Sequence, residues 1–353
     1  MNTLPQETLE QIFSLACDDG GATACALALT SKSIRAAACA TRFHSVALFA
    51  NLEPLKALVA LYKEQRRIST RHRPRMKHLY LTLPFDPCPP VTHHDFMCTF
   101  GTTHELPYYC ALRALFDAVA EDLQSLVIEV DFQLETLPVL SQPFPNLREL
   151  TVIDIWSPRP LLDGDNVGPL FPAVTHLHLM PTDRSHRSAG NLGAWSEHAP
   201  NAIHLRISGI EPDRKHSFQK DLQEALDLST AELLHLDTVG TRRATRGQNS
   251  ERKTHAHLRY IALQICASRQ DAAVSARRRA GRQQEVKMFK GWLAKMVEYP
   301  AFENLRIVAL APCGAGTDSP STEWPKTARA HWMERLQGGK GSWSRPSDAI
   351  KYV

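Results

Sequence analysis

The chain has 353 residues, a formal net charge of +4, 43% hydrophobic residues and 22% charged residues. These values are ordinary for a folded globular protein and exclude wholesale disorder. No apolar run approaches the roughly 18 residues that would span a bilayer, and residues 1–5 lack the pattern of a secretory signal. We therefore expect a cytoplasmic or nuclear protein with no membrane partner. The eight cysteines follow no disulfide framework, so most should be free thiols.

The charge is unevenly distributed along the chain. Residues 63–78 contain seven Lys or Arg and one Glu, and residues 241–256 and 269–290 are also basic. The remainder of the chain is therefore net acidic. Such a distribution argues against nucleic-acid binding by the whole protein, although local basic patches remain.

Three short helices are predicted in the first 45 residues. Thr3 and Gln6 form a capping-box pattern around Pro5, and an apolar face follows at Leu9, Ile12, Phe13 and Ala16. Further helices are expected at about 22–29 and 32–41, then a short strand around 46–48 and an amphipathic helix around 55–62. Helices this short bury little apolar surface, so the unit should be completed by a partner or by the next domain.

The residues of this segment carry a family resemblance. They read Leu4-Pro5-x-Glu7-x-Leu9-x-x-Ile12, then Leu27-Ala28-Leu29-Thr30-Ser31-Lys32-x-x-Arg35, then Phe43-x-Ser45-Val46-x-Leu48. This pattern resembles an F-box of the type common in fungal proteins. Many F-boxes have an aromatic residue in the third helix, where this chain has Ala36-Ala37-Ala38-Cys39.

The resemblance implies binding to the Skp-type adaptor subunit of an SCF (cullin–RING) ubiquitin ligase, and through it to a cullin. Carried over to this chain, the adaptor-binding residues would be Leu4, Pro5, Leu9, Ile12, Leu29 and Ile34. The alternative interpretation is an ordinary helical cap on the domain that follows.

A repeated phrase, apolar-x-x-apolar-x-apolar, dominates the rest of the chain. Its fourth position falls at Leu79, Leu126, Leu150, Leu177, Leu205, Leu236, Ile261 and Val308. Most of these positions lie 24 to 31 residues apart, and two intervals of 47 residues correspond to two units or to one long insertion. Turns such as Phe144-Pro145-Asn146 and Phe171-Pro172-Ala173 precede several units. The pattern resembles leucine-rich repeats, in which Cys266 and Cys313 would occupy the Asn/Cys ladder position.

Together these patterns predict an α/β protein with a three-helix F-box at 1–50 and a linking helix and basic linker at 51–75. An irregular leucine-rich-repeat-like solenoid with a curved parallel sheet would occupy 76–312, with loop insertions at about 84–105, 241–256 and 268–283. A C-terminal cap would occupy 313–353, where we expect a helix at 328–336 and a Trp-rich end that covers the last strand.

The outward positions of the predicted strands should line the concave face of the solenoid. They include the candidate target-binding residues His78, Tyr80, Glu149, His176, His178, Arg206, His235, Asp237 and Tyr260. A strip of His, Arg and Tyr is a plausible surface for recognising a protein, whereas the simpler interpretation is exposed polar surface.

No pattern for catalysis stands out. Cys88, His93, His94 and Cys98 could in principle bind zinc, but adjacent histidines rarely both ligate one ion and the segment is rich in proline. We find no nucleophile elbow, no His-Glu-x-x-His helix and no P-loop. We therefore expect no enzyme, no metal and no cofactor.

The sequence favours a substrate-recognition adaptor of an SCF-type ubiquitin ligase that holds an unknown target protein on its repeats. A leucine-rich-repeat scaffold unconnected to ubiquitination is the main alternative. A zinc-dependent activity at Cys88–Cys98 and a basic-patch nucleic-acid binder are less favoured hypotheses, and no nucleic acid is expected as a partner.

Overall fold

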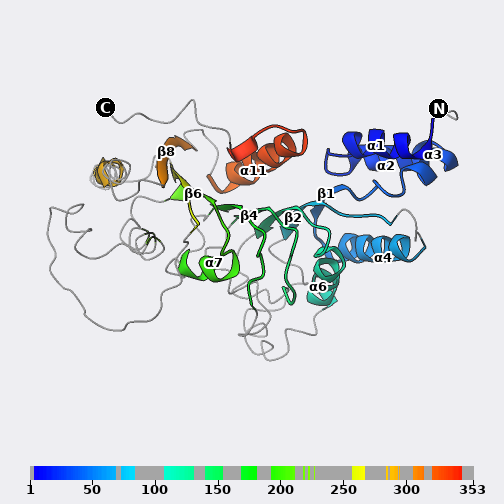
Figure 1. Cartoon of the computed structure of the whole chain (residues 1–353), viewed down its shortest axis with the longest axis horizontal. Coiled ribbons are helices and arrows are strands. Elements are labelled where there is room, and N and C mark those ends of the chain that lie inside the picture. Colours follow the sequence, from blue (N-terminus) through cyan, green and yellow to red (C-terminus); the bar gives the residue numbers. More distant parts are fainter. Residues whose placement is uncertain are drawn as a thin grey trace, which may run out of the picture. The chain divides into compact units, whose positions relative to one another are not determined.

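The fold was analysed in a computed structural model of the chain (Figure 1). The structure describes residues 4–68, 73–83, 107–130, 140–153, 168–180, 192–210, 257–266, 287–292, 305–313 and 320–343, together with single positions between 218 and 294. Within these ranges, no helix combines the length and the apolar character that crossing a membrane requires.

The protein has an α/β fold with an open parallel sheet, as predicted. The strands are β1 (Ser45–Phe49), β2 (His78–Leu83), β3 (Ser125–Val130), β4 (Glu149–Ile153), β5 (His176–Met180), β6 (His204–Ile210), β7 (Tyr260–Cys266) and β8 (Arg306–Cys313). They follow chain order in the sheet, and the strand pairs with described registers are all parallel. The longer helices are α1 (Gln6–Ala16), α2 (Ala22–Thr30), α4 (Leu52–Ile68), α6 (Pro107–Val119) and α11 (Pro320–Leu336), and the shorter ones are α3 (Lys32–Ala37) and α7 (Leu192–His198).

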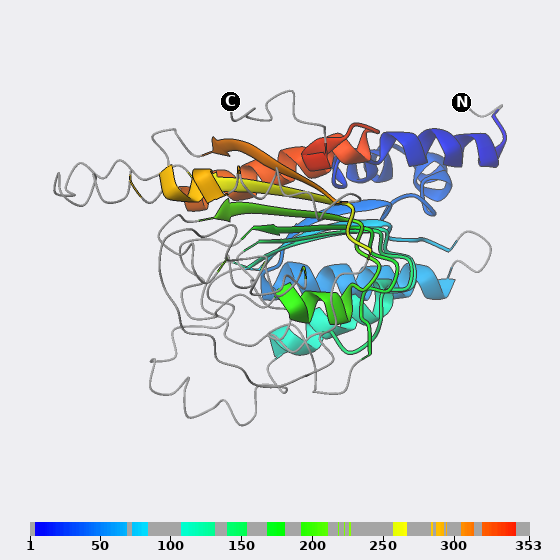
Figure 2. The same cartoon turned by 60° about the vertical axis from the view of Figure 1, so that its left-hand side comes forward.

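The chain divides into two compact units, which are described separately below. The first unit contains α1 to α4, β1 to β4, α6 and the C-terminal segment 326–344, and the second contains β5 to β8 and α7. The N-terminal helices, predicted as a separate domain at 1–50, thus belong to the same unit as the first four strands. In the first unit, α4 and α6 lie on one side of the strands and α11 lies on the other (Figure 2).

The repeated phrase sets the strand register through most of the sheet. Leu79, Leu126 and Leu150 are in register in the first unit, and Leu177, Leu205 and Ile261 are in register in the second. All six side chains are at most 1% exposed. The fourth position of these six phrases therefore points into the core, because side chains alternate between the two faces of a strand.

One detail of the predicted repeat is wrong, because Ile261 pairs with Ile307 rather than with Val308. The run Ile307-Val308-Ala309-Leu310 is apolar throughout, so the sequence alone could not mark which of its residues faces the core. Strand β6 pairs directly with β7. The unit expected at 233–238 lies outside the described residues.

Contacts between phenylalanine rings explain the recurring Phe-Pro turn in the first unit. The ring centroids of Phe116 and Phe144 are 6.0 Å apart, and those of Phe144 and Phe171 are 5.8 Å apart. The backbone N–H of Phe144 donates to the carbonyl of Leu170 over 2.7 Å. Each turn therefore places an aromatic ring on that of its neighbour, where edge and tilted contacts are favourable.

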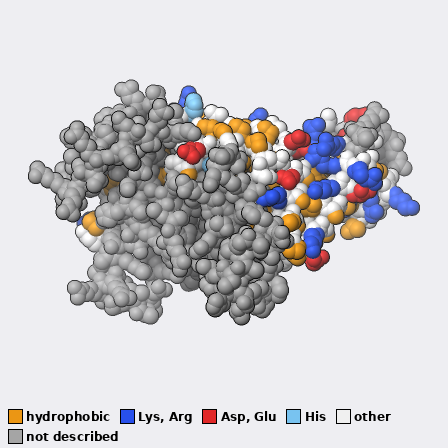
Figure 3. All heavy atoms as spheres, turned by 90° about the horizontal axis from the view of Figure 1, so that it is seen from below, with side chains coloured by type: hydrophobic (Ala, Val, Ile, Leu, Met, Phe, Trp, Pro, Cys, Tyr) orange, Lys and Arg blue, Asp and Glu red, His pale blue; other side chains and the backbone are white. Residues whose placement is uncertain are grey.

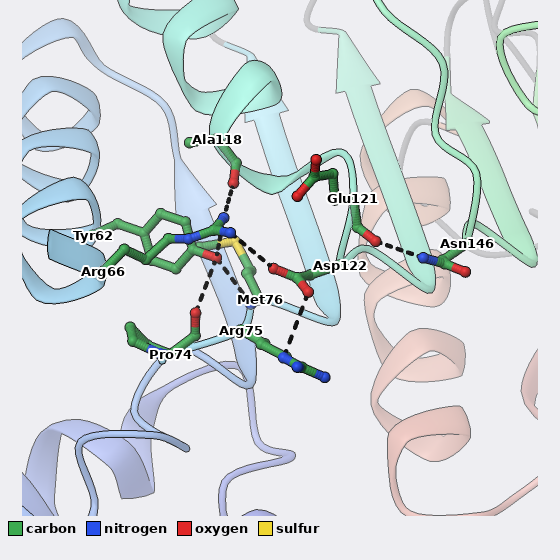
Figure 4. A network of polar contacts seen from close by, with 9 residues as sticks. All are labelled: Tyr62, Arg66, Pro74, Arg75, Met76, Ala118, Glu121, Asp122 and Asn146. Carbon is green, nitrogen blue, oxygen red and sulfur yellow. Dashed lines mark hydrogen bonds and ion pairs between the residues drawn. The ribbon is translucent and has the colours of Figure 1, made fainter. Parts of the chain in front are cut away.

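Polar contacts join α4 to the loops beside it (Figure 4). The guanidinium of Arg66 donates to the carbonyl of Ala118 and lies 3.5 Å from the carboxylate of Asp122. The Tyr62 hydroxyl accepts the N–H of Met76 over 3.3 Å. Asn146, from the Phe-Pro-Asn turn, donates to the carbonyl of Glu121 over 2.6 Å. These bonds satisfy backbone groups at a helix end and fix the linking helix to the sheet.

Candidate functional site

The N-terminal helical module, residues 4–44, has a small core of its own. Leu9 and Ile34 pack against a buried cluster formed by Phe13, Cys17, Ala24, Ala37 and Ala38. The Ser31 hydroxyl caps α3 by accepting the N–H of Ile34 over 3.2 Å. The three predicted helices are confirmed, although α1 begins at Gln6 with Pro5 as its N-cap residue and no side-chain cap.

Four large apolar side chains of this module are exposed. The exposed fractions are 44% for Leu4, 46% for Ile12, 77% for Leu15 and 81% for Leu29. In α2, all residues except two threonines are apolar, so the helix presents apolar side chains both to the core and to the outside. A helix that is apolar all round is normally covered on every side. The module therefore has an outer surface suited to a partner.

The predicted adaptor-binding residues fall into two groups. Leu4, Pro5, Ile12 and Leu29 are exposed, whereas Leu9 and Ile34 are half-buried against the core of the module. Leu15 was missed in the sequence, although it lies three residues after Ile12 and thus on the same side of α1.

The module is attached to the edge strand β1 by hydrogen bonds. The Ser45 hydroxyl donates to the carbonyl of Cys17 over 2.5 Å and accepts the N–H of Gly20 over 3.1 Å. The N–H of Ala47 donates to the carbonyl of Gly20 over 2.9 Å. Gly20 and Gly21 have φ values of 76° and 103°, which a side chain would strain. The turn after α1 thus caps the free edge of the sheet.

The first sheet face is defined as the side of β2 to β4 that carries His78, Tyr80, Ser125, Glu129 and Glu149. Helix α11 covers it. The rings of Trp332 and Tyr80 are 5.6 Å apart, and the Trp332 indole N–H donates to Ser125 over 3.3 Å. Arg335 donates with Nε to Glu149 over 3.1 Å and forms a second bond to the same carboxylate through Nη2.

This placement of α11 corrects one prediction. The final helix expected at 328–336 is confirmed, but Trp332 packs on strands β2 and β3 rather than covering the last strand. Periodicity identified the helix, whereas its docking position depends on Tyr80, Ser125 and Glu149, which are more than 180 residues away in the sequence.

Beneath α11, hydrogen bonds join the polar side chains of the first sheet face to one another. The Tyr80 hydroxyl donates to Glu129 over 3.0 Å, and Thr82 donates to the same carboxylate over 2.9 Å. The His78 ring lies 2.8 Å from the Ser125 hydroxyl. Burial, helped by the nearby His44 and Lys77, lowers the pKa of His78 to about 3. His78 is therefore neutral at physiological pH.

The second sheet face is defined as the side of β5 to β7 that carries His176, His178, His204, Arg206 and Tyr260. The rings of His176 and His204 stack with centroids 4.4 Å apart, and Tyr260 lies 5.6 Å from His204. His178 and the guanidinium of Arg206 share the Ser208 hydroxyl at 3.0 and 3.1 Å. Burial lowers the pKa of His204.

The candidate target-binding residues differ in accessibility. Tyr80, His178 and Arg206 are 3%, 2% and 8% exposed, so they do not form part of an exposed strip as expected. Four others are half-buried: His78, Glu149, His176 and Tyr260. His235 and Asp237 lie outside the described residues. Target binding by this set stays a prediction.

Metal and thiol chemistry find little support in the described part of the chain. No group of three His, Cys, Asp or Glu that could hold a metal ion occurs there, and the weak zinc candidate at Cys88–Cys98 lies outside it. Three described cysteines, Cys17, Cys25 and Cys39, are free thiols. Burial raises the pKa of Cys17 to about 11, so this thiol is an inert part of the core.

Comparison of the chain with protein-family models, curated proteins and solved structures found no match.

Proposed function

We propose that this protein is a substrate-recognition adaptor of an SCF-type cullin–RING ubiquitin ligase. In this proposal the N-terminal helical module binds the Skp-type adaptor subunit, and the repeats hold a target protein. The proposal assigns no bond chemistry to the chain, which would act in the cytoplasm or nucleus by bringing the target to the catalytic partners of the ligase at raised effective concentration.

The exposed apolar surface of the module is the observation that supports the proposal. Leu4, Ile12, Leu15 and Leu29 are all at least 44% exposed on a module whose core consists mainly of alanines and one phenylalanine. Large apolar side chains gathered on a small module normally mark a protein-binding site. Burying side chains of this size would contribute roughly 1.5–3 kcal/mol each.

The attachment at β1 supports a fixed orientation between the adaptor-binding module and the strands of the first unit. Because Gly20, Ser45 and Ala47 join the module to the edge strand by hydrogen bonds, the adaptor and the first unit would keep a defined orientation. A target held on this unit would then be presented at a defined distance from the ligase, which raises the effective concentration of its lysines.

The same attachment also favours a second candidate function. A helical module that covers the edge of a sheet is what a repeat protein needs as a terminal cap. A leucine-rich-repeat scaffold unconnected to ubiquitination would have this feature. It would give no reason, however, for an exposed leucine at position 29.

The test is capture of purified Skp-type adaptor by the full-length chain and by a Leu15→Glu/Leu29→Glu variant. Both side chains are at least 77% exposed, so the variant should fold with a melting temperature within about 2 °C of wild type. We expect the wild type to bind at micromolar concentration and the variant to lose binding by at least about tenfold.

Leu61→Glu is the matched control, because Leu61 is an exposed leucine on α4, outside the module. It should leave adaptor binding unchanged. Absence of binding by the folded wild type, or equal binding by the double variant, would favour the scaffold function instead.

A further inference from the structure

The basic segment at 63–78, noted in the sequence, is not used by the proposed adaptor surface. Its described part contains six Lys or Arg and one carboxylate, Glu64. The six are Lys63, Arg66, Arg67, Arg73, Arg75 and Lys77. Figure 3 shows Lys and Arg side chains gathered toward the right-hand end of the face it draws, the end where α4 and the N-terminal helices lie in Figure 1.

Packing brings the two halves of this segment together. The Tyr62 hydroxyl at the C-terminal half of α4 contacts the backbone of Pro74 and Met76. Arg66 and Arg75 reach the same carboxylate of Asp122, at 3.5 and 3.7 Å (Figure 4). The side chains of Lys63 and Arg67 lie one turn apart on α4 and therefore on one side of the helix.

Internal ion pairs do not neutralise this surface. Asp122 serves two arginines, and Arg66, whose side chain is 11% exposed, depends on it more than Arg75, which is 68% exposed. Arg67 is paired with Glu64 at 2.8 Å. Lys63 and Arg73 are exposed and form no ion pair with any described residue.

The dipole of α4 stabilises only some of the positive charges in this basic segment. Arg66 and Arg67 lie in the last turn of α4, where cations are stabilised by the helix C-terminus. Arg73 and Arg75 follow the helix in a segment without regular structure, so the dipole gives no reason for their charge. A set of exposed like charges with too few partners is costly to assemble unless something compensates them.

We propose that the surface formed by Lys63, Arg67, Arg73 and Arg75, called here the basic surface, binds an acidic segment of a partner protein, rich in Asp and Glu. The recognition is electrostatic: exposed cations attract the partner and set its orientation more than its final affinity. The proposal is independent of the adaptor role, because the surface lies on α4 and the following segment rather than on the N-terminal helical module.

An acidic protein segment fits this surface better than nucleic acid does. Strong duplex binding uses roughly six to ten phosphate contacts, and single strands also need exposed aromatic rings for base stacking. The basic surface has four cations, and Tyr62, the aromatic residue beside them, is fully buried. The small number of charges matches a short acidic peptide.

The test is a titration of the full-length chain with a short labelled peptide of alternating Glu and Ser, followed by fluorescence anisotropy. A second peptide with Gln in place of Glu has the same length and no charge. At about 0.1 M salt, where charges are screened over about 10 Å, we expect saturable binding of the Glu peptide only. At about 1 M salt, where the screening length is about 3 Å, this binding should disappear.

A Lys63→Glu/Arg73→Glu variant should lower the affinity for the Glu peptide at least about tenfold, because it reverses the charge of two exposed cations that form no ion pair within the described part of the chain. The matched control is Lys326→Glu/Lys340→Glu, which makes the same change of net charge at exposed positions of the C-terminal segment. The control should stay within about twofold of wild type.

Three results would overturn the proposal. The first is no saturable binding of the Glu peptide, and the second is an equal loss in both double variants, which would indicate attraction by net charge alone. The third is tighter binding of a duplex oligonucleotide than of the Glu peptide, which would assign the surface to nucleic acid. None of these results bears on capture of the ligase adaptor, which is measured separately.

Discussion

The strands of the two sheet faces carry the same sequence phrase, but the polar side chains on the two faces have different partners. His78 in β2 and His176 and His204 in β5 and β6 all precede the inward leucine of their strand. On the first face the surrounding polar side chains bond to α11, through Trp332 and Arg335. On the second face the rings of His176, His204 and Tyr260 contact one another, and His178 and Arg206 both bond to Ser208.

The difference shows that a repeat position does not determine what covers it. The first face provides a ring at Tyr80, a hydroxyl at Ser125 and a carboxylate at Glu149, which match one apolar and one cationic side chain a helical turn apart on α11. The second face provides imidazoles that stack, and an imidazole and a guanidinium that share the hydroxyl of Ser208.

The largest effect should come from Trp332→Ala. Trp332 is 5% exposed and contacts both Tyr80 and Ser125, so its removal leaves a cavity between α11 and the first face. We expect a loss of about 3–5 kcal/mol in the free energy of unfolding, measured by urea denaturation. A loss below about 1 kcal/mol would mean that α11 is not held on this face in solution.

The Arg335–Glu149 pair should have a smaller effect. Replacing Glu149 by Gln keeps the shape but removes the charge that faces a partly buried guanidinium, which is 33% exposed. We expect a destabilisation of about 1–3 kcal/mol. A double-mutant cycle with Arg335→Met should give a coupling energy of at least about 0.5 kcal/mol, and additive effects would show that the pair is not formed.

The smallest effect should be a pH dependence that distinguishes the two faces. The folded-state pKa of His78 is about 3, below the value of about 6.5 for an unfolded histidine, so the neutral form is favoured in the fold. Its contribution to stability is present above about pH 6.5 and is lost as the pH falls toward 3. Between pH 7 and pH 5 the unfolding free energy should fall by about 2 kcal/mol from this residue.

The comparison variants are His78→Gln and His204→Gln, each measured by urea unfolding at both pH values. His78→Gln should remove most of the pH-dependent loss. His204→Gln should remove less, because desolvation alone lowers the pKa of His204, whereas His44 and Lys77 add to the effect of burial at His78. Equal effects of the two substitutions would show that these added charges make no difference.

Much of the secondary structure could be predicted from local patterns. The apolar spacing of Leu9 and Phe13 predicts the inward side of α1, and the strand phrase predicts the buried positions of six strands, from Leu79 to Ile261. These inferences succeed because a helix repeats every 3.6 residues and a strand every two, so the period reveals the buried side.

Other features could not be predicted, for identifiable reasons. The continuous apolar run at 306–310 left the register of β8 ambiguous. Leu15 was assigned neither to the predicted apolar face of the first helix nor to the adaptor-binding residues, and only the packing of α1 on α2 and α3 shows that it is exposed. The buried state of Tyr80 and Arg206 depends on partners distant in the sequence.

The sequence by itself determined the fold class, the positions of most helices and strands, the basic segment after α4 and the resemblance on which the proposed function rests. Tertiary structure alone decided that α11 lies across β2 to β4, that four large apolar side chains remain exposed on the N-terminal helical module, and that Asp122 is shared by two arginines. The physical reason is that periodicity is a local property of the chain, whereas burial and charge compensation depend on which distant side chains meet.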